Sequence, residues 1–237
     1  MASSGSLNLG DWSAPEALLP SQISEAAPID ARGANWSGQV LGSLDLRQAK
    51  LCRVDLRGTD LSQCQLEDAD LRLAIYDTDT KAPDDFDLRT SGAIGPGAKL
   101  NGAFLNNADL RGIDLRGGVL MGAYLSGTDL SGAQLDGVSL AGSDMRSAVL
   151  RGAMCRGARF GTSELDMADL RGADLHDAAL DAVQSIKGAD FSHCLGLEDQ
   201  LSTLLTRPIT ELDCWNPLTR CTTRDSLESL KAKAHSS

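Results

Sequence analysis

The chain has 237 residues, which fits one large domain or two small ones, and only 4% of them are aromatic, so an ordinary aromatic-rich core is excluded. Hydrophobic residues make up 42% and charged residues 23%, which is close to globular usage and argues against a disordered chain. The formal net charge is -11, with no basic stripe and no long apolar run, so neither direct nucleic-acid binding nor a transmembrane segment is expected.

Residues 1–30 are rich in Ser, Ala and Pro, which predicts a flexible N-terminal tail or a cap for the segment that follows. Trp12 and the pair Leu18–Leu19 favour some docking of this stretch. It has neither a basic start nor an apolar middle, so we predict no secretory signal and expect the cytoplasm as the compartment.

Residues 31–76 form a first block of repeats, in which every fifth residue is bulky and apolar. The series is Trp36, Leu41, Leu46, Leu51, Leu56, Leu61, Leu66, Leu71 and Tyr76. A period of five matches neither the 3.6 residues of a helical turn nor the alternation of an ordinary strand. The block is therefore neither an amphipathic helix bundle nor a conventional sandwich.

Residues 77–97 interrupt this period, and their Asp, Pro and Gly content predicts a loop insertion. Phe86 and Leu88 could fold it back onto the repeats. Its aspartates lack the glycine and the final glutamate of an EF-hand, so we predict solvated charge and no metal site. A long loop on a rigid scaffold is a place for recognition, and a tolerated insertion is the alternative. The candidate partner-binding residues here are Tyr76, Asp77, Asp84, Asp85, Phe86 and Asp87.

Residues 98–191 form the second block of repeats. Sixteen of the seventeen residues at every fifth position from Leu100 to Leu180 are Leu, Met or Phe, and the exception is Cys155. Two residues before each of them, Ala is the commonest residue, and two residues after each of them, Gly is the commonest. The unit reads Ala-Asp-Leu-Arg-Gly, as in Ala108–Gly112 and Ala168–Gly172.

A coil with flat sides explains this pattern. Residues two apart on an extended segment share a face, so the central residue and the small residue before it point inward while Asp and Arg face water. Gly at the end of each pentad suits a corner that needs a positive φ. Stacked turns would then pair their backbones at about 4.8 Å per layer.

Residues 192–237 predict a C-terminal helical cap. The segment Gly196–Thr206 places Leu197, Leu201, Leu204 and Leu205 on one stripe, and the pattern Thr222-x-x-Asp225 begins a second helix. With Trp215 these helices could cover the open end of the coil, since an open end exposes unpaired backbone and leucines. The alternative is a surface for a partner or for a homodimer, for which Trp215 is a further candidate residue.

The A-[D/N]-L-x-x units resemble those of the pentapeptide-repeat family across about residues 31–191. The resemblance implies an all-β solenoid, a right-handed four-sided β-helix in which residues twenty apart stack. Interior columns would then be Leu100, Leu120, Leu140, Phe160 and Leu180, and Leu115, Leu135, Cys155 and Leu175. The start of the insertion, Tyr76-Asp77-x-x-Thr80 with Phe86-Asp87 following, resembles an insertion found in cyanobacterial members.

The chain is poor in groups that could perform catalysis. His176 follows Leu175 at an outward position, His193 follows the last repeat, His235 lies in the terminal tail, and none has a recognisable nucleophile beside it. The six cysteines form neither a CxxC pair nor a metal-ligand spacing, so we expect free thiols. No phosphate-binding or metalloprotease motif occurs, and we predict no enzyme, no cofactor and no metal.

The leading functional hypothesis is a non-enzymatic scaffold that presents rigid faces to an unidentified protein partner. The alternative, from the quinolone-resistance branch of the family, is a DNA mimic that binds gyrase. Mimicry needs a continuous negative face, whereas the two repeat blocks carry only -1 (36–76) and -3 (98–191). The segment Phe160–Asp181 carries a local charge of -5 that a basic partner could use, or that only keeps the protein soluble.

Overall fold

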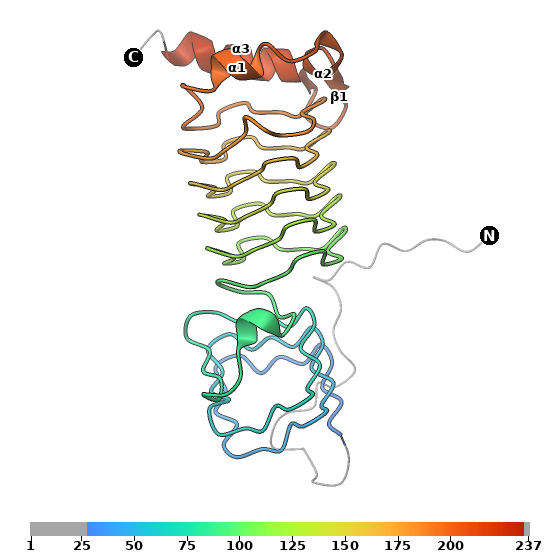
Figure 1. Ribbon diagram of the computed structural model, residues 1–237, viewed down its shortest axis with the longest axis vertical. Coiled ribbons are helices and arrows are strands. Elements are labelled where there is room, and N and C mark those ends of the chain that lie inside the picture. Colours follow the sequence, from blue (N-terminus) through green and yellow to red (C-terminus); the bar gives the residue numbers. More distant parts are fainter. Residues whose placement is uncertain (1–27, 235–237) are drawn as a thin grey trace, which may run out of the picture. The chain divides into compact units, whose positions relative to one another are not determined.

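A computed structural model describes residues 28–234, with side chains up to residue 231. The predictions for residues 1–27 and for His235 lie outside the described residues. The chain divides into two compact units, Met1–Lys99 (unit 1) and Leu100–Ser237 (unit 2). Each unit consists of turns of backbone stacked on one another, and Figure 1 shows those of unit 2 beneath three helices.

Residues twenty apart pair in parallel along the repeats of both units. Asp109 pairs with Asp129 in unit 2 and Asp30 pairs with Lys50 in unit 1. Each pairing is a single-residue bridge, so the repeats contain no long strands. The bridging residue precedes the central leucine, and the amide of Leu110 donates to the carbonyl of Asp129 at 2.8 Å. A turn of the coil therefore takes four pentads, as the family resemblance implied.

A corner separates one pentad from the next. The amide of Ile113 donates to the carbonyl of Leu110 at 3.2 Å, and Gly112 between them has a φ of 64°. Positive φ recurs every fifth residue through most of the second block, which explains the glycines of the sequence pattern. Corners without glycine also occur, as at Thr162 with a φ of 57°.

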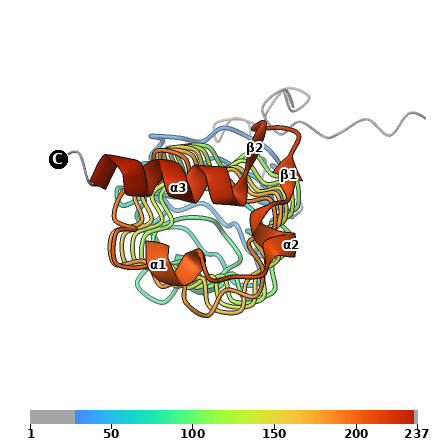
Figure 2. The same cartoon turned by 90° about the horizontal axis from the view of Figure 1, so that it is seen from above.

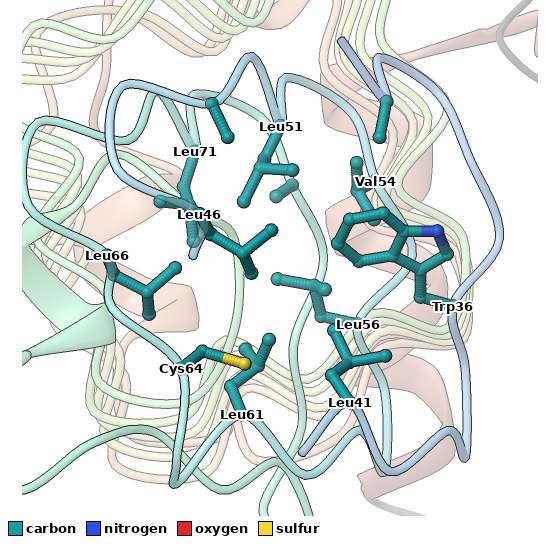
Figure 3. Close-up of a cluster of buried hydrophobic side chains, with 14 of the residues drawn as sticks. Trp36, Leu41, Leu46, Leu51, Val54, Leu56, Leu61, Cys64, Leu66 and Leu71 are labelled. Carbon is teal, nitrogen blue, oxygen red and sulfur yellow. The ribbon is translucent and has the colours of Figure 1, made fainter. Parts of the chain in front are cut away.

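In unit 1 the core is one cluster of mostly aliphatic side chains, with Trp36, Cys64 and Tyr76 among them. Trp36, Leu46 and Leu56 have no exposed surface. Figure 3 shows Trp36, Leu41, Leu46 and Leu51 with their side chains directed into the interior of the coil. Phe86 and Leu88 of the segment 77–97 pack against the same cluster, as the sequence suggested.

In unit 2 the residues at the fifth positions fall into four sets whose members are twenty residues apart, and we call the part of the coil around each set a side. All seventeen residues at the fifth positions from Leu100 to Leu180 are buried, and Cys155 has no exposed surface. The expectation that the central residues of the second block are buried is confirmed. We number the sides by their central residues: side 1 by Leu100 and Leu120, side 2 by Leu105 and Leu125, side 3 by Leu110 and Leu130, and side 4 by Leu115 and Leu135.

The segment 77–97 stays joined to the turns of unit 1. Lys81 pairs with Asp60 and Ile94 pairs with Ile75, spacings of twenty-one and nineteen residues. Between them lies the short helix η2, Leu88–Thr90, which the Asp87 side chain caps. Only part of the segment therefore departs from the coil. The domain limits drawn from the sequence remain a prediction.

The helices after residue 200 differ from the predicted ones. The stripe Gly196–Thr206 yields only one turn, α1 (Leu201–Leu204), because Pro208 follows closely. Three elements were not predicted: α2 (Ile209–Leu212) and the antiparallel strands β1 (Trp215–Asn216) and β2 (Cys221–Thr222). The second predicted helix is confirmed as α3 (Thr223–Ala234), where Thr222 Oγ1 accepts from the amide of Asp225.

These elements cover the last turn of unit 2, as Figure 2 shows from above. Gln200 accepts from the amide of Leu180 and donates to the carbonyl of Ala178, at 3.2 and 2.8 Å. Arg207 donates to the carbonyl of Val183 at 3.0 Å, and Glu211 accepts from the amide of Ile186. Backbone groups that an open end would leave unpaired therefore find side-chain partners.

Candidate interaction surfaces

The outward surface of the repeats is built from pairs of Asp and Arg two residues apart. Asp109 precedes Leu110 and Arg111 follows it, so both face water on the same side. Arg111 Nε and Nη2 donate to the two carboxylate oxygens of Asp109 at 2.8 and 2.6 Å. The same bidentate pairs occur at Asp114–Arg116, Asp144–Arg146 and Asp169–Arg171 in unit 2. The hydrogen bonds from Arg111 hold the pKa of Asp109 below its ordinary value.

Acidic and basic residues also occur together on each of the two sides that carry most of the Asp–Arg pairs, sides 3 and 4. From residue 98 to 191, side 3 carries four aspartates against three arginines, and side 4 carries four aspartates against two arginines. On neither side does an uninterrupted row of unpaired carboxylates form, because each Arg is bonded to an Asp. The acids of the segment Phe160–Asp181 are spread over all four sides.

Large apolar side chains are exposed at several outward positions. Phe104 is 75% exposed and stacks on Tyr124, with ring centroids 4.7 Å apart and planes 3° apart. Met121, at the corner before Tyr124, is also exposed, and so are Met154 and Leu195 on side 4. In the terminal elements Ile209, Trp215 and Leu218 are exposed. The stacked pair Phe104–Tyr124 is the contact between two exposed apolar side chains in this set, and the other residues are exposed at separate positions.

The predicted residues of the segment 77–97 are split between interior and surface. Tyr76 is buried, and its hydroxyl donates to the carbonyl of Pro96 at 2.8 Å. Asp77 Oδ1 accepts from the amides of Gly58 and Thr80, at 2.8 and 3.0 Å. Burial raises the pKa of Asp77, but these hydrogen bonds outweigh it and the net pKa is lowered. Both residues hold the chain in place.

The other four predicted residues lie further along the segment. Asp84 and Asp85 are exposed, Phe86 is half-buried against the core of unit 1, and Asp87 caps η2 while paired to Arg89. Of these four, only Asp84 and Asp85 are exposed and outside any ion pair of the described residues. The sequence could not distinguish the aspartates that hold the backbone from those that are only exposed, because the role of each Asp depends on where the backbone turns.

Strands β1 and β2 form a hairpin, residues 215–222, which we call the terminal hairpin. Trp215 is 55% exposed on β1, and its neighbour Asn216 fixes the terminal hairpin to the coil. Asn216 is fully buried, and its Nδ2 donates to the carbonyls of Gly188 and Met167 at 2.9 and 3.2 Å. Trp215 therefore stands on a fixed support. The sequence singled out Trp215 but missed Asn216, whose partners lie 28 and 49 residues away.

No group of three or more His, Cys, Asp or Glu side chains that could hold a metal ion occurs among the described residues. His176 is exposed, as predicted, and its Nδ1 lies 2.6 Å from Asp174 Oδ1. The six cysteines are all free. Within residues 28–234 we find no helix with the length and apolar content that crossing a bilayer requires.

Sequence reasoning did not single out Phe104, Tyr124 or Met154. The signal was present, because Phe104 and Tyr124 are twenty residues apart at the outward position before a leucine, where most repeats have a polar residue. This pattern predicts a contact between the two rings only when residues twenty apart are known to stack.

Comparison with known proteins agrees with the repeat geometry. The family of pentapeptide repeats matches in eight copies, over residues 41–75, 91–117, 97–132 and 128–165. A pentapeptide repeat protein from the thylakoid lumen of Arabidopsis thaliana is 30% identical, with a TM-score of 0.52, over 56% of this chain and 89% of that one. No curated protein sequence matches the chain.

Two further solved structures align over more of the chain but superpose less well. HetL, a pentapeptide repeat protein involved in heterocyst differentiation regulation in the cyanobacterium Nostoc, is 25% identical over 71% of this chain and 83% of that one, with a TM-score of 0.24. QnrB1, a plasmid-mediated fluoroquinolone resistance protein, is 20% identical over 73% of this chain and 89% of that one, with a TM-score of 0.34.

Proposed function

Because this chain belongs to the pentapeptide repeat family, we propose that it is a non-enzymatic protein-binding or scaffold protein that presents the rigid sides of its repeats to a protein partner. The observation that carries this proposal is the fixed spacing of its outward side chains. Each stands on a backbone bridged to the turns before and after it, so a partner meets a surface that loses little entropy on binding. Large apolar residues such as Phe104 are exposed on that surface.

We assign the protein the right-handed, four-sided β-helix of its family. The twenty-residue bridges and the four corners per turn support this assignment. The corresponding division of the chain is an N-terminal tail or cap (1–30), two repeat blocks (31–76 and 98–191), an insertion (77–97) and a C-terminal helical cap (192–237).

Affinity purification from the source cell tests the protein-binding function. Deletion of residues 77–97 would remove the bridges at Lys81 and Ile94, so the sharper variant is Asp84→Ser with Asp85→Ser, which changes only exposed side chains. Trp215→Ser with Leu218→Ser probes the terminal hairpin in the same way. A binder lost with one variant locates the recognition surface. If the unaltered chain captures no protein above a repeat-protein control, the proposal fails.

We also propose that the terminal hairpin forms a homodimer contact. Ile209, Trp215 and Leu218 are exposed there within ten residues of sequence, around a hairpin that Asn216 fixes in place. Light scattering at several concentrations measures the mass, and Trp215→Ser with Leu218→Ser should shift a dimer to the monomer. A mass that stays monomeric at all concentrations excludes the contact.

We do not favour the DNA-mimic alternative. A duplex presents two continuous rows of phosphate charge, whereas the carboxylates of sides 3 and 4 are interleaved with arginines. A gyrase supercoiling assay decides between the two functions, since inhibition at micromolar protein would restore the mimic.

For the compartment we propose the cytoplasm, where thiols stay reduced. The six free cysteines support this, while the Arabidopsis relative comes from the thylakoid lumen. Fractionation of the source cell with detection of the protein in each fraction tests the assignment.

A further inference from the structure

Sides 3 and 4 of unit 2 present arginines outermost, although the chain as a whole is acidic. We call the five residues Arg111, Arg116, Arg151, Arg156 and Arg171 the arginine surface. The Arg156 side chain is 64% exposed, whereas its partner Asp174 is 13% exposed. Arg151 is 57% exposed over Asp169, which is 9% exposed. A partner at this surface therefore touches guanidinium groups before it reaches any paired carboxylate.

The carboxylates beneath are already saturated with donors. Asp169 accepts from Arg171 through both oxygens, at 2.8 and 2.7 Å, and Arg151 Nε lies 3.1 Å from its Oδ2. Asp174 accepts from Arg156 Nε through Oδ2 and contacts His176 Nδ1 through Oδ1, both at 2.6 Å. Little acceptor capacity remains on these two groups.

The arginines, in contrast, keep donors free. A guanidinium carries five N–H groups, and the bonds to Asp109, Asp114 and Asp169 use only Nε and Nη2. Among the described residues, Nη1 of none of these arginines makes a hydrogen bond. On the paired Asp and Arg groups of the surface, the hydrogen-bonding capacity that remains consists mainly of donors, which match a partner that supplies acceptors.

Two exposed apolar side chains lie on side 4, one between arginines of the surface and one a turn beyond the last of them. Met154 is 41% exposed at the outward position between Arg151 and Arg156. It is bridged to Asp174, which is bridged in turn to Leu195, 53% exposed, so Met154 and Leu195 stand in the same column of side 4. Met and Arg are enriched at protein interfaces, where an apolar centre is surrounded by polar groups.

On sides 3 and 4 the exposed aspartates are fewer than the exposed arginines. Asp129 and Asp136 are partly exposed and Asp177 is exposed, against four arginines of the surface that are about half exposed or more, while Arg171 is 34% exposed. At long range the net negative charge of the chain weakens the attraction of an acidic molecule. At contact, solvent and salt screen charges beyond about 8 Å, so acids elsewhere on the chain count little. The carboxylates paired with these arginines lie within that distance and reduce the attraction, so binding depends on the free donors and on the apolar contact.

We propose that the arginine surface, with Met154 and Leu195, binds an acidic amphipathic segment of a partner protein. This inference rests on the protein-binding function proposed above. Apolar residues of the segment cover Met154 and Leu195, and its carboxylates accept from the free guanidinium donors on either side. The surface extends over four layer spacings from Arg111 to Leu195, roughly 19 Å, which a helix of about 13 residues spans.

A protein segment fits this surface better than a nucleic acid does. A duplex carries one charge per about 1.7 Å and would bring its phosphates over Asp129, Asp136 and Asp177 as well. A peptide can place its carboxylates over the arginines alone. Nucleic-acid binding is therefore the competing outcome of the test.

The test is fluorescence anisotropy with the full chain and a labelled helical peptide of Leu and Glu, and with its counterpart in which Lys replaces every Glu. We expect the Glu peptide to bind at least about tenfold more tightly than the Lys peptide, and to weaken as salt is raised. Equal or tighter binding of the Lys peptide overturns the proposal. So does a 20-base-pair DNA duplex that binds more tightly than the Glu peptide.

Variants locate the binding. Met154→Ser leaves every ion pair intact and should weaken the Glu peptide about threefold to tenfold, because an apolar contact is lost. Arg156→Gln should weaken it by a similar factor. Arg146→Gln on side 2 removes the same kind of Asp–Arg pair away from the surface and should change affinity less than about twofold. Equal losses in all three variants overturn the proposal.

The two proposals can fail separately. If the chain captures a cellular partner whose binding is unchanged by Met154→Ser and Arg156→Gln, the protein-binding function stands and the arginine surface is excluded. Circular dichroism melting curves of the variants establish that each is folded under the conditions of the binding measurement.

Discussion

The ring of Phe104 lies parallel to the ring of Tyr124, one turn further along the coil, at a centroid distance of 4.7 Å. The stack forms because outward residues twenty apart face each other across one bridge. Stacked aromatic pairs add about 0.5–1.5 kcal/mol beyond the area that they bury. The pair therefore contributes to the stability of unit 2 while its edges stay in water.

A double-mutant cycle measures this contribution. We expect Phe104→Ala and Tyr124→Ala each to lower the free energy of unfolding in urea, and the double variant to lose about 0.5–1.5 kcal/mol less than the sum of the two single changes. Strictly additive losses would show that the rings do not stabilise each other in solution.

The corners of the coil predict opposite effects of substitution at equivalent positions. Thr162 is β-branched and has a φ of 57°, so Thr162→Gly should stabilise the protein by about 1 kcal/mol. Gly112 has a φ of 64° and open space around a Cβ, so Gly112→Ala should destabilise it by a similar amount for backbone reasons alone. Urea unfolding of both variants checks the signs. Two changes of the same sign would contradict the role of φ at these corners.

The interior thiols should be inert. Burial raises the pKa of the Cys194 thiol to about 12 and raises that of Cys155 as well. We expect an alkylating reagent to modify Cys52, Cys214 and Cys221, which are partly exposed, well before Cys155 and Cys194 in the native protein. Peptide mass spectrometry over a time course gives the order. Modification of Cys155 as fast as that of Cys52 would place its side chain at the surface.

Acid should weaken unit 1 in a defined pH range. Hydrogen bonds from Ser62 and then Lys81 lower the pKa of Asp60 from its ordinary 3.8 to about 2. Since the folded pKa is the lower one, the stabilisation is complete above the ordinary value and is lost as the pH falls from about 4 toward 2. Asp60→Asn should flatten the fall of the urea midpoint over this range. Asp84→Asn, at an exposed position, serves as the control and should leave the fall unchanged.

The stability of the terminal hairpin should depend on the side chain of Asn216. Asn216→Ala removes the donors to the carbonyls of Gly188 and Met167 and leaves both without that partner, at a cost of about 1–3 kcal/mol. Hydrogen exchange should then accelerate in β1, in β2 and in the last turn of the coil. Arg220→Lys changes an exposed residue of the same hairpin and should leave exchange near the unaltered rate. Equal acceleration in both variants would exclude this role for Asn216.

The sequence predicted some contacts of the outward surface and missed others. The outward placement of Asp109 and Arg111 followed from the alternation around Leu110, and the bidentate bond between them agrees with it. The clamp of Asp169 between Arg151 and Arg171 did not follow, because it joins neighbouring turns. The terminal elements were predicted least well, since α2, β1 and β2 are too short to show a period and owe their form to contacts with the last turn.

The sequence by itself determined which residues are interior, because a bulky side chain at every fifth position can be buried together in only one kind of backbone. It also determined the corners, since glycine marks most of the positions with positive φ. Tertiary structure alone decided which charges of neighbouring turns meet, as Arg151 meets Asp169 and Arg156 meets Asp174. Those contacts depend on the stacking of residues about twenty apart, which is not a property of one pentad.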